Sequence, residues 1–335
     1  MTRAPIAVTM GEPAGIGGEI ALKAWATHTV PPFFLIDSAS RLEALAESLR
    51  LDVPVRRITA AAEATRVFDA ALPVLELPKT RAVAFALGRP DPANAAAVIA
   101  AIDAAVALAR TGEAAAIVTN PIQKASLQAA GFAFPGHTEY LGHLAGGRHA
   151  VMMLAVERPQ PPLRVIPVTV HTPLARVATE LTAAAIIACG RATAAALRRD
   201  FGIAQPRLAV AGLNPHAGES GKIGDEETRI IAPAVAQLKA DGIAVRGPAP
   251  ADTLFHDAAR AAYDAVLCMY HDQALVPLKT LDFAGGVNVT LGLPFVRTSP
   301  DHSTALDIAP RGVADPTSFR AALELAARIA AARGA

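Results

Sequence analysis

The sequence predicts an α/β fold built on a largely parallel sheet, and two observations lead to that prediction. Short runs rich in β-branched residues alternate with alanine-rich stretches of helical periodicity along almost the whole chain, as expected of repeated strand–helix–strand units. Hydrophobic residues make up 52% of the chain and aromatic residues only 4%, so we expect a core of closely packed aliphatic side chains. The 335 residues suffice for two domains or one large α/β unit.

Seven strands and six helices are predicted from these patterns. The strand candidates are rich in β-branched and other apolar residues, at residues 6–10, 33–37, 116–120, 150–156, 164–170, 207–213 and 265–270. The helix candidates have apolar residues at helical spacing, at residues 16–26, 39–49, 92–110, 182–200, 226–240 and 317–332. The last helix starts on a Thr–Ser pair and ends before Gly334, as helix-terminus signals require.

Two breaks in the pattern predict how the chain divides. The segment AGFAFPGHTEYLG interrupts the helical pattern after residue 130, and a second break lies near residues 300–311. We therefore expect a first α/β subdomain of residues 1–130 with 305–335, to which the last helix returns. Residues 131–304 would form the second subdomain.

Composition excludes several classes of function. The formal charge is +1, with no basic stripe interleaved with aromatic residues, so nucleic acid is not an expected partner. The two cysteines form no CxxC motif, which indicates a reducing compartment and buried thiols. The N-terminal apolar stretch is too short for a signal peptide, and residues 93–109 are expected to be too short and too polar to cross a membrane. We expect a cytoplasmic protein.

Three of the nine histidines follow the ends of different predicted strands: His171, His216 and His271. Ligands of open parallel sheets bind outside the carboxyl ends of the strands, so these imidazoles could converge. Three neutral imidazoles with open positions for water and substrate are the usual plan of a catalytic metal site. Taken singly, each histidine is better explained by a structural role, such as a hydrogen bond to a backbone carbonyl, and their spacing by itself is not a metal motif.

The first loop, MGEPAGIGGEI, follows a strand and opens a helix, where backbone N–H groups would favour a phosphate. Asp37 ends the next predicted strand at the distance expected of the ribose-binding acid of a Rossmann site. The third glycine of the G-x-G-x-x-G motif is absent, because Gly15 and Gly17 are followed by Ile20. On these residues, a dinucleotide site and a sharp turn beside a ligand cleft both remain open.

Three further segments carry polar groups that suit a ligand. The glycine-rich loop GLNPHAGESGKIGDEE could be the wall of a site or a mobile surface loop. His137 and Thr138 follow a Pro-Gly turn, where they could clamp an anionic substrate or form a plain capped turn. Lys279, Asn288 and Arg297 offer cationic and amide groups that suit a phosphate and a carboxylate, although each alone would be typical of a solvated surface.

Together these motifs resemble the 4-hydroxythreonine-4-phosphate dehydrogenase family of vitamin B6 biosynthesis, whose fold is isocitrate/isopropylmalate dehydrogenase-like. The matching stretches run in order along nearly the whole chain: MGEPAGIGGEI, TNPIQKASL, GHTEYL, NPHAGE, PADTLF, MYHDQ and GVNVTLGLPFVRTSPDHSTALDIA. The resemblance implies two α/β subdomains that flank a cleft and a homodimer with its active site at the interface. It also implies one divalent metal per site (Zn, Mg or Co) and NAD or NADP bound without a Rossmann domain.

The resemblance assigns residues position by position. The implied metal ligands are His171, His216 and His271. The implied substrate-binding residues are His137, Thr138, Lys279, Asn288 and Arg297. Cofactor-binding residues stay unassigned. Asp272 and Asp252 are hypotheses for the general base, and Lys279 is also counted as catalytic. A further hypothesis takes His171 and His216 from one chain and His271 from its partner.

The implied reaction oxidises 4-phosphooxy-L-threonine with NAD(P)+ to 2-amino-3-oxo-4-phosphooxybutanoate. This product then loses CO2 to give 3-amino-2-oxopropyl phosphate, in the biosynthesis of pyridoxal 5'-phosphate. A metal would stabilise the negative charge that develops on the C3 oxygen in both steps. Three alternatives stay open: a 4-phospho-D-threonate or 4-phospho-D-erythronate dehydrogenase, a non-redox phosphate acyltransferase of the same fold, and a binding protein that has lost catalysis.

Two positions depart from the family pattern. Gly18 stands where the family usually has proline, and Ser303 stands where it usually has glycine. Neither is an implied ligand position. Each could alter a loop and therefore the substrate preference.

Overall fold

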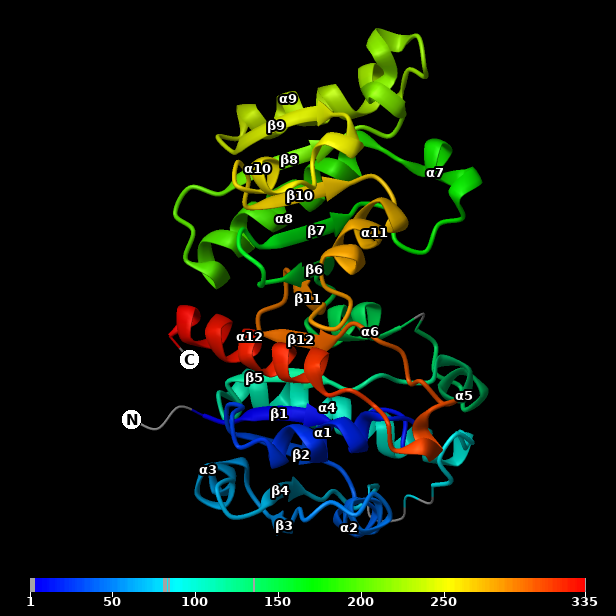
Figure 1. Cartoon of the computed structure of the whole chain (residues 1–335), viewed down its shortest axis with the longest axis vertical. Helices are drawn as coiled ribbons and strands as arrows, with labels where there is room; N and C mark the ends of the chain where they lie inside the picture. Colours follow the sequence, from blue (N-terminus) through cyan, green and yellow to red (C-terminus); the bar gives the residue numbers. More distant parts are fainter. Residues whose placement is uncertain (1–3, 81–82, 84, 135, 335) are drawn as a thin grey trace. The chain divides into compact units, whose positions relative to one another are not determined.

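The computed structural model describes residues 4–80, 83, 85–134 and 136–334. The chain forms two compact units, Met1–Ala150 with Leu293–Ala335 and Val151–Gly292 (Figure 1). Each has its own strands, helices and buried aliphatic core.

The first unit holds a parallel sheet in the order β3-β4-β2-β1-β5-β12. Its strands are β1 (Ile6–Thr9), β2 (Phe33–Ile36), β3 (Val55–Ile58), β4 (Leu72–Leu75), β5 (Ala116–Thr119) and β12 (Arg297–Pro300). Its α-helices are α1 (Gly17–Ala26), α2 (Ala39–Ser48), α3 (Ala64–Val67), α4 (Ala95–Thr111), α5 (Lys124–Ala129), α6 (His137–Leu144) and α12 (Thr317–Arg333). Short 3-10 helices are η1 (Ala61–Glu63), η2 (Pro92–Asn94) and η6 (Ala309–Arg311). The C-terminal helix α12, red in Figure 1, packs on β12 and β5.

The second unit holds strands in the order β11-β6-β7-β10-β8-β9. The β11–β6 and β6–β7 pairs are antiparallel, and the β7–β10, β10–β8 and β8–β9 pairs are parallel. Its strands are β6 (Val151–Val156), β7 (Leu163–Pro167), β8 (Arg207–Ala211), β9 (Ala244–Ala249), β10 (Ala265–Cys268) and β11 (Val287–Leu291). Its helices are α7 (Leu174–Glu180), α8 (Ala183–Phe201), η3 (Pro215–Gly221), η4 (Glu227–Ile231), α9 (Ala232–Ala240), η5 (Ala251–Thr253), α10 (Asp257–Arg260) and α11 (His271–Leu281).

The predicted fold class, α/β with a largely parallel sheet, is confirmed. Every predicted strand and helix is present, with ends that differ by a few residues. The patterns missed β3, β4, β9, β11 and β12. Of these, β3 and β9 carry arginines at exposed positions, so they lack a run of apolar residues. Strand β12 is polar in sequence and nevertheless fully buried, and a burial pattern of that kind cannot be read from hydrophobicity.

The observed units differ from the predicted subdomains, because residues 131–150 and 293–304 belong to the first unit. The break that the sequence predicted after residue 130 therefore lies inside that unit. Phe132, Phe134 and Tyr140 form an aromatic cluster packed on its core, with ring centroids 4.9–5.5 Å apart. The Tyr140 hydroxyl donates a 2.5 Å hydrogen bond to Asp103 on α4. These contacts hold α6 against α4.

One expectation about membrane segments is corrected. The helical segment Pro92–Thr111 has 20 residues and is long and apolar enough to cross a membrane by length and composition, as is the bent pair of α7 and α8. In the structure, the apolar face of α4 packs on β1 and β5 and includes Val98, Ala101 and Ile102, each at most 2% exposed. Its hydrophobicity is therefore accounted for by the core of the first unit.

Both cysteines are buried free thiols, as the sequence predicted. Burial raises the pKa of Cys189 to about 11 and that of Cys268 further. Neither thiol is therefore a ready nucleophile at neutral pH.

Candidate functional site

The three histidines singled out in the sequence follow the carboxyl ends of three strands in the second unit's sheet. Strand β10 pairs in parallel with β7 on one side and β8 on the other, so the carboxyl ends of these three strands are adjacent. His171 lies beyond β7, His216 beyond β8, and His271 begins α11 after β10. The topology therefore places the histidines on three neighbouring connections at the edge where ligands of parallel sheets bind.

The structure brings two of these histidines together. The ring centroids of His171 and His271 are 6.2 Å apart, with their planes tilted by 35°. Both line a pocket of about 240 Å³ with Val170, Thr172, Leu174, Val177, Tyr270 and Asp272. His216 does not line this pocket. Within the described part of the chain, no group of three or more His, Cys, Asp or Glu side chains could hold a metal ion.

Asp272 acts directly on His271. The His271 Nδ1 and the Asp272 carboxylate are 2.7 Å apart. When Nδ1 carries the proton and donates to the carboxylate, Nε2 keeps its lone pair for a metal, which is the usual arrangement of a metal-bound histidine and its carboxylate neighbour. The Asp272 side chain is 76% exposed, so the interaction orients the ring more than it stabilises the fold.

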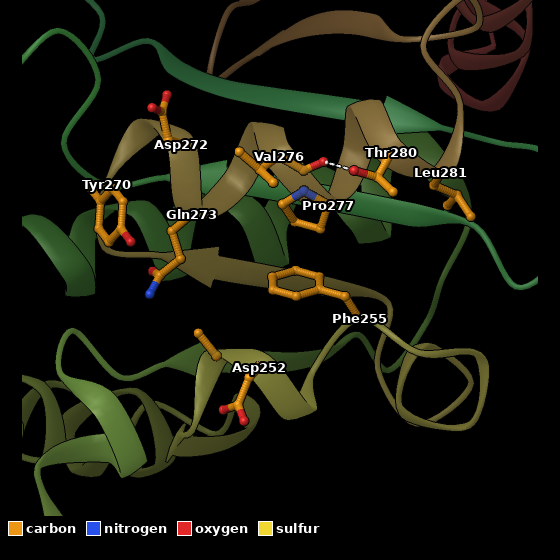
Figure 2. Close-up of a pocket in the computed structure, with 10 residues that line it drawn as sticks. Asp252, Phe255, Tyr270, Asp272, Gln273, Val276, Pro277, Thr280 and Leu281 are labelled. Atoms are coloured by element: carbon orange, nitrogen blue, oxygen red, sulfur yellow. Dashed lines mark hydrogen bonds between the residues drawn. The ribbon is translucent and has the colours of Figure 1, made fainter.

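The two predicted general bases line a second pocket, of about 580 Å³ (Figure 2). Asp272 lies on α11 and Asp252 on η5, and Phe255 lies between these two elements. Their carboxylates point away from each other in Figure 2. The structure therefore does not bring the two acids to one position, and Asp272 is already engaged with His271.

Gln273 is a residue whose role the sequence did not reveal. Its side chain is 8% exposed. The carbonyl Oε1 accepts a 2.6 Å hydrogen bond from the Met269 backbone N–H, and Nε2 donates a 2.8 Å bond to the Gly212 carbonyl. Gln273 therefore ties the connection that leads into His271 to the end of β8, where the loop to His216 starts.

The loop that carries His216 has an unusual backbone. Residues 216–220 all have left-handed φ values, between 44° and 76°, and only Gly218 among them is a glycine. Each non-glycine residue in this conformation costs about 1–2 kcal/mol, so the loop needs support from outside. Glu227 supplies it: the carboxylate is 4% exposed, and Oε1 accepts 2.7 Å hydrogen bonds from the N–H groups of Leu213 and Asn214.

The remaining predicted substrate residues of the second unit are Lys279 and Asn288. Lys279 follows His271 by two turns of α11, and its Nζ lies 5.1 Å from the ring centroid of the exposed Phe283. Asn288 lies on β11, and its Oδ1 is inaccessible to solvent without a hydrogen-bond partner in the described structure. A buried acceptor of this kind is free to receive a hydrogen bond from a ligand.

In the first unit, His137, Thr138 and Arg297 are the predicted substrate residues. Arg297 is 4% exposed, and its Nε and Nη2 donate to the Thr119 hydroxyl at 3.2 and 2.6 Å. Burial lowers the pKa of Arg297 to about 10, so the guanidinium stays charged at neutral pH. Burial, then the charges of Arg297 and Lys124, hold the pKa of His137 well below its usual value. His137 and Thr138 are the first two residues of α6.

The first loop does not form a Rossmann site. The Asp37 carboxylate is fully buried and paired with Arg41, whose Nε donates to Oδ1 at 3.0 Å and whose Nη2 pairs with Oδ2. Arg41 Nη1 also donates to the Pro13 carbonyl within the loop. The acid is therefore a structural partner of the loop. At the helix start, a Cβ on Gly18 would lie 2.7 Å from the Leu45 side chain, so α1 and α2 pack closely there.

Two of the three predicted histidine ligands are placed as a divalent metal would require. Two accessible imidazoles share a pocket, and one of them has the carboxylate neighbour that a metal-bound histidine usually has. Imidazole donors suit zinc and other first-row metals.

The chain is similar to known proteins along nearly its whole length. A family model described as pyridoxal phosphate biosynthetic protein PdxA matches residues 29–326. The 4-hydroxythreonine-4-phosphate dehydrogenase of Caulobacter vibrioides is 54% identical over 100% of both chains, and that of Paracoccus denitrificans is 56% identical over 99% of this chain and 100% of its own. The crystal structure of the Klebsiella pneumoniae enzyme of that name is 41% identical, with a TM-score of 0.86 over 98% of this chain and 99% of its own.

These matches cover nearly all of the chain, as the quoted motifs did, and they confirm the predicted resemblance. The chain belongs to the PdxA family of pyridoxal phosphate biosynthetic proteins.

Proposed function

We propose that this chain is a 4-hydroxythreonine-4-phosphate dehydrogenase. It oxidises 4-phosphooxy-L-threonine with NAD(P)+ to 2-amino-3-oxo-4-phosphooxybutanoate, which decarboxylates to 3-amino-2-oxopropyl phosphate. The observation that carries this assignment is the identity above 50%, over full length, to relatives that bear this name.

His171, His216 and His271 would hold the metal, with Asp272 keeping the His271 ring in its binding tautomer. When bound, a divalent cation supplies a Lewis acid at the C3 oxygen of the substrate, and NAD(P)+ supplies the hydride acceptor. Because one chain groups only two of these histidines, we propose that the ligand set is completed across a homodimer. The single-chain geometry of His171 and His271 supports such sharing.

The other residues would bind the substrate and move its proton. Arg297 and Lys279 bind the anionic groups, and His137, Thr138 and Asn288 supply hydrogen bonds that fix the carbon chain. Asp252 is the stronger candidate to accept the C3 hydroxyl proton, because Asp272 is bonded to His271. Its carboxylate lines the 580 Å³ pocket, which Tyr270 and Asp272 also line, and those two residues line the pocket of His171 and His271 as well.

The substrate is tested by following reduced nicotinamide absorbance. Three substrates are compared with NAD and NADP in parallel: 4-phosphooxy-L-threonine, 4-phospho-D-threonate and 4-phospho-D-erythronate. We expect turnover with the threonine phosphate. Turnover only of 4-phospho-D-threonate or 4-phospho-D-erythronate would mean that the protein is the alternative dehydrogenase. Absence of nicotinamide reduction with all three substrates would favour the non-redox phosphate acyltransferase.

The metal is tested on the same assay. Exhaustive chelation, confirmed by elemental analysis, should abolish turnover, and Zn²⁺, Mg²⁺ or Co²⁺ should restore it. Full turnover by the metal-free protein would show that the histidines have no catalytic metal.

A further inference from the structure

The buried guanidinium of Arg297 is held by a neutral side chain. Its Nε and Nη2 both donate to the hydroxyl of Thr119, at 3.2 and 2.6 Å. Thr119 is fully buried and Arg297 is 4% exposed. The two donor nitrogens form one edge of the planar guanidinium, so bonds from both of them to one oxygen fix the plane of the group.

The strand register explains how the two side chains meet. Arg297 on β12 is aligned with Ile117 on β5, and Thr119 lies two residues further along β5. Side chains two residues apart share one face of a sheet, and two residues span about 7 Å. The Arg297 side chain therefore extends along the sheet toward the carboxyl end of β5, the end at which ligands of parallel sheets bind.

Thr119 can orient the cation without neutralising it. A carboxylate in the same place would pair with the guanidinium and cancel much of its charge, whereas a hydroxyl adds no negative charge. Burial lowers the pKa of Arg297 to about 10, so the group is still charged at neutral pH. A guanidinium held by its Nε–Nη2 edge can present its Nη1–Nη2 edge to an oxyanion as a fork.

We propose that Thr119 is a positioning residue, which orients the Arg297 guanidinium toward an anionic group of the substrate. This assignment rests on the proposed function, in which Arg297 binds that group. Thr119 itself acts through Arg297 and needs no contact with the substrate. Loss of its hydroxyl should therefore weaken binding of the anion in a protein that still folds.

The experiment uses the full-length, metal-loaded protein, and calorimetry measures the Kd of 4-phosphooxy-L-threonine in the absence of NAD(P)+. The variants are Thr119→Val, Thr119→Ser and the control Thr298→Val. Thr298 is a fully buried threonine on β12, and its hydroxyl donates to the Ala322 carbonyl at 2.9 Å. Both valine variants thus remove a hydrogen bond from a buried threonine of the first unit, and urea denaturation should show both to be less stable than the wild type.

The affinities should nevertheless differ. We expect Thr119→Val to raise Kd by about tenfold or more, Thr119→Ser by less than about threefold, and Thr298→Val not at all, because only Thr119 holds the guanidinium. In turnover, Thr119→Val should raise KM much more than it changes kcat. An unchanged Kd in Thr119→Val, or an equal rise in Thr298→Val, would overturn the assignment.

A double-mutant cycle tests whether Thr119 acts through Arg297. Arg297→Lys removes the fork, so adding Thr119→Val to it should change Kd by less than about twofold. A full tenfold effect in that background would mean that Thr119 does not act through Arg297. If Thr119→Val does not fold, Thr119→Cys replaces it, since a thiol is a weak acceptor of similar size. A Kd for Thr119→Cys equal to that of Thr119→Ser would then refute the role of the hydroxyl.

A second compound separates this assignment from the proposed function. If the wild type oxidises only 4-phospho-D-threonate and Thr119→Val raises the Kd of that compound, the positioning role stands and the substrate assignment fails. If the wild type oxidises 4-phosphooxy-L-threonine and Thr119→Val keeps its KM, the dehydrogenase stands and the positioning role fails. If the wild type binds neither compound, both assignments fail.

Discussion

Neutral residues determine how the reactive side chains are held. The Thr119 hydroxyl accepts two hydrogen bonds from the buried Arg297 guanidinium, and the Gln273 amide joins the two connections that lead to His271 and His216. Neither stands out in the sequence, because a threonine ending a strand and a glutamine starting a helix are common. The charged and histidine residues could be found from sequence, whereas the partners that orient them required three-dimensional contacts.

The depressed pKa of His137 makes stability depend on pH. The unfolded chain binds a proton at His137 below about pH 6.5, whereas the folded chain keeps the imidazole neutral. The contribution of His137 is therefore fully present above pH 6.5 and is lost as the pH falls toward the lowered folded value. The slope is at most about 1.4 kcal/mol per pH unit, the value for a difference of one bound proton between the unfolded and folded chains.

The pH dependence of the free energy of unfolding is measured by urea denaturation of the wild type and His137→Gln between pH 8 and pH 5. We expect the wild type to lose more free energy of unfolding than the variant below pH 6.5. Parallel curves over that range would mean that His137 titrates normally in the folded chain.

Replacing Gln273 by Leu should weaken both the fold and metal binding. The Met269 N–H and the Gly212 carbonyl would be left buried without partners, at about 1–3 kcal/mol each. Gln237→Leu is the matched control, because Gln237 makes one exposed hydrogen bond on α9. We expect a lower free energy of unfolding and a raised Kd for Co²⁺ in Gln273→Leu only. Equal effects in the two variants would remove Gln273 from the support of the site.

At the scale of elements, helices with a continuous apolar period and apolar strands were predictable, whereas very short helices and the proline-containing helix α11 were not. Helices α5, α6 and α11 carry or precede the site residues. Helices α5 and α6 are short and begin with polar residues, and α11 contains Pro277. Tertiary contacts stabilise them, such as the Tyr140–Asp103 bond of α6. Patterns of hydrophobicity carry little information about such elements.

The left-handed loop of residues 216–220 depends on η4, where Glu227 lies. Glu227→Ala should remove the acceptor of the Leu213 and Asn214 N–H groups and cost about 3 kcal/mol or more. Hydrogen exchange should then be faster across residues 213–221. Glu226→Ala is the control, since among the described residues Glu226 accepts a hydrogen bond only from the Asn214 side chain, at 2.7 Å, and a smaller effect is expected. Unchanged exchange in Glu227→Ala would show that the loop holds its conformation by itself.

At the scale of the whole molecule, the predictions concern which chain of a homodimer supplies each of the three histidines. If His171 and His216 of one chain meet His271 of its partner, mixed dimers of His171→Ala and His271→Ala chains regain one intact site. The proximity of His171 and His271 within one chain raises a second arrangement, in which His216 comes from the partner. Then His171→Ala and His216→Ala chains would complement each other instead.

Refolding the variants in pairs decides between these arrangements. Random assortment makes about half the dimers mixed, and half of their sites are intact, so about a quarter of wild-type activity should return in the complementing pair. Each single-variant homodimer should be inactive. Recovery in neither pairing, from refolded dimers of confirmed size, would mean that each chain supplies its own full ligand set.

The close contact at Gly18 bears on how this chain diverged. A side-chain atom at that position would collide with the end of Leu45, and the buried Arg41 guanidinium lies 3.2 Å away. A proline there, as the family usually has, needs the space that Leu45 fills in this chain. We therefore expect residues 18 and 45 to vary together among relatives: where residue 18 is proline, residue 45 should have a smaller or displaced side chain. Gly18→Pro alone should destabilise this protein, and Gly18→Pro with Leu45→Ala should recover part of the loss.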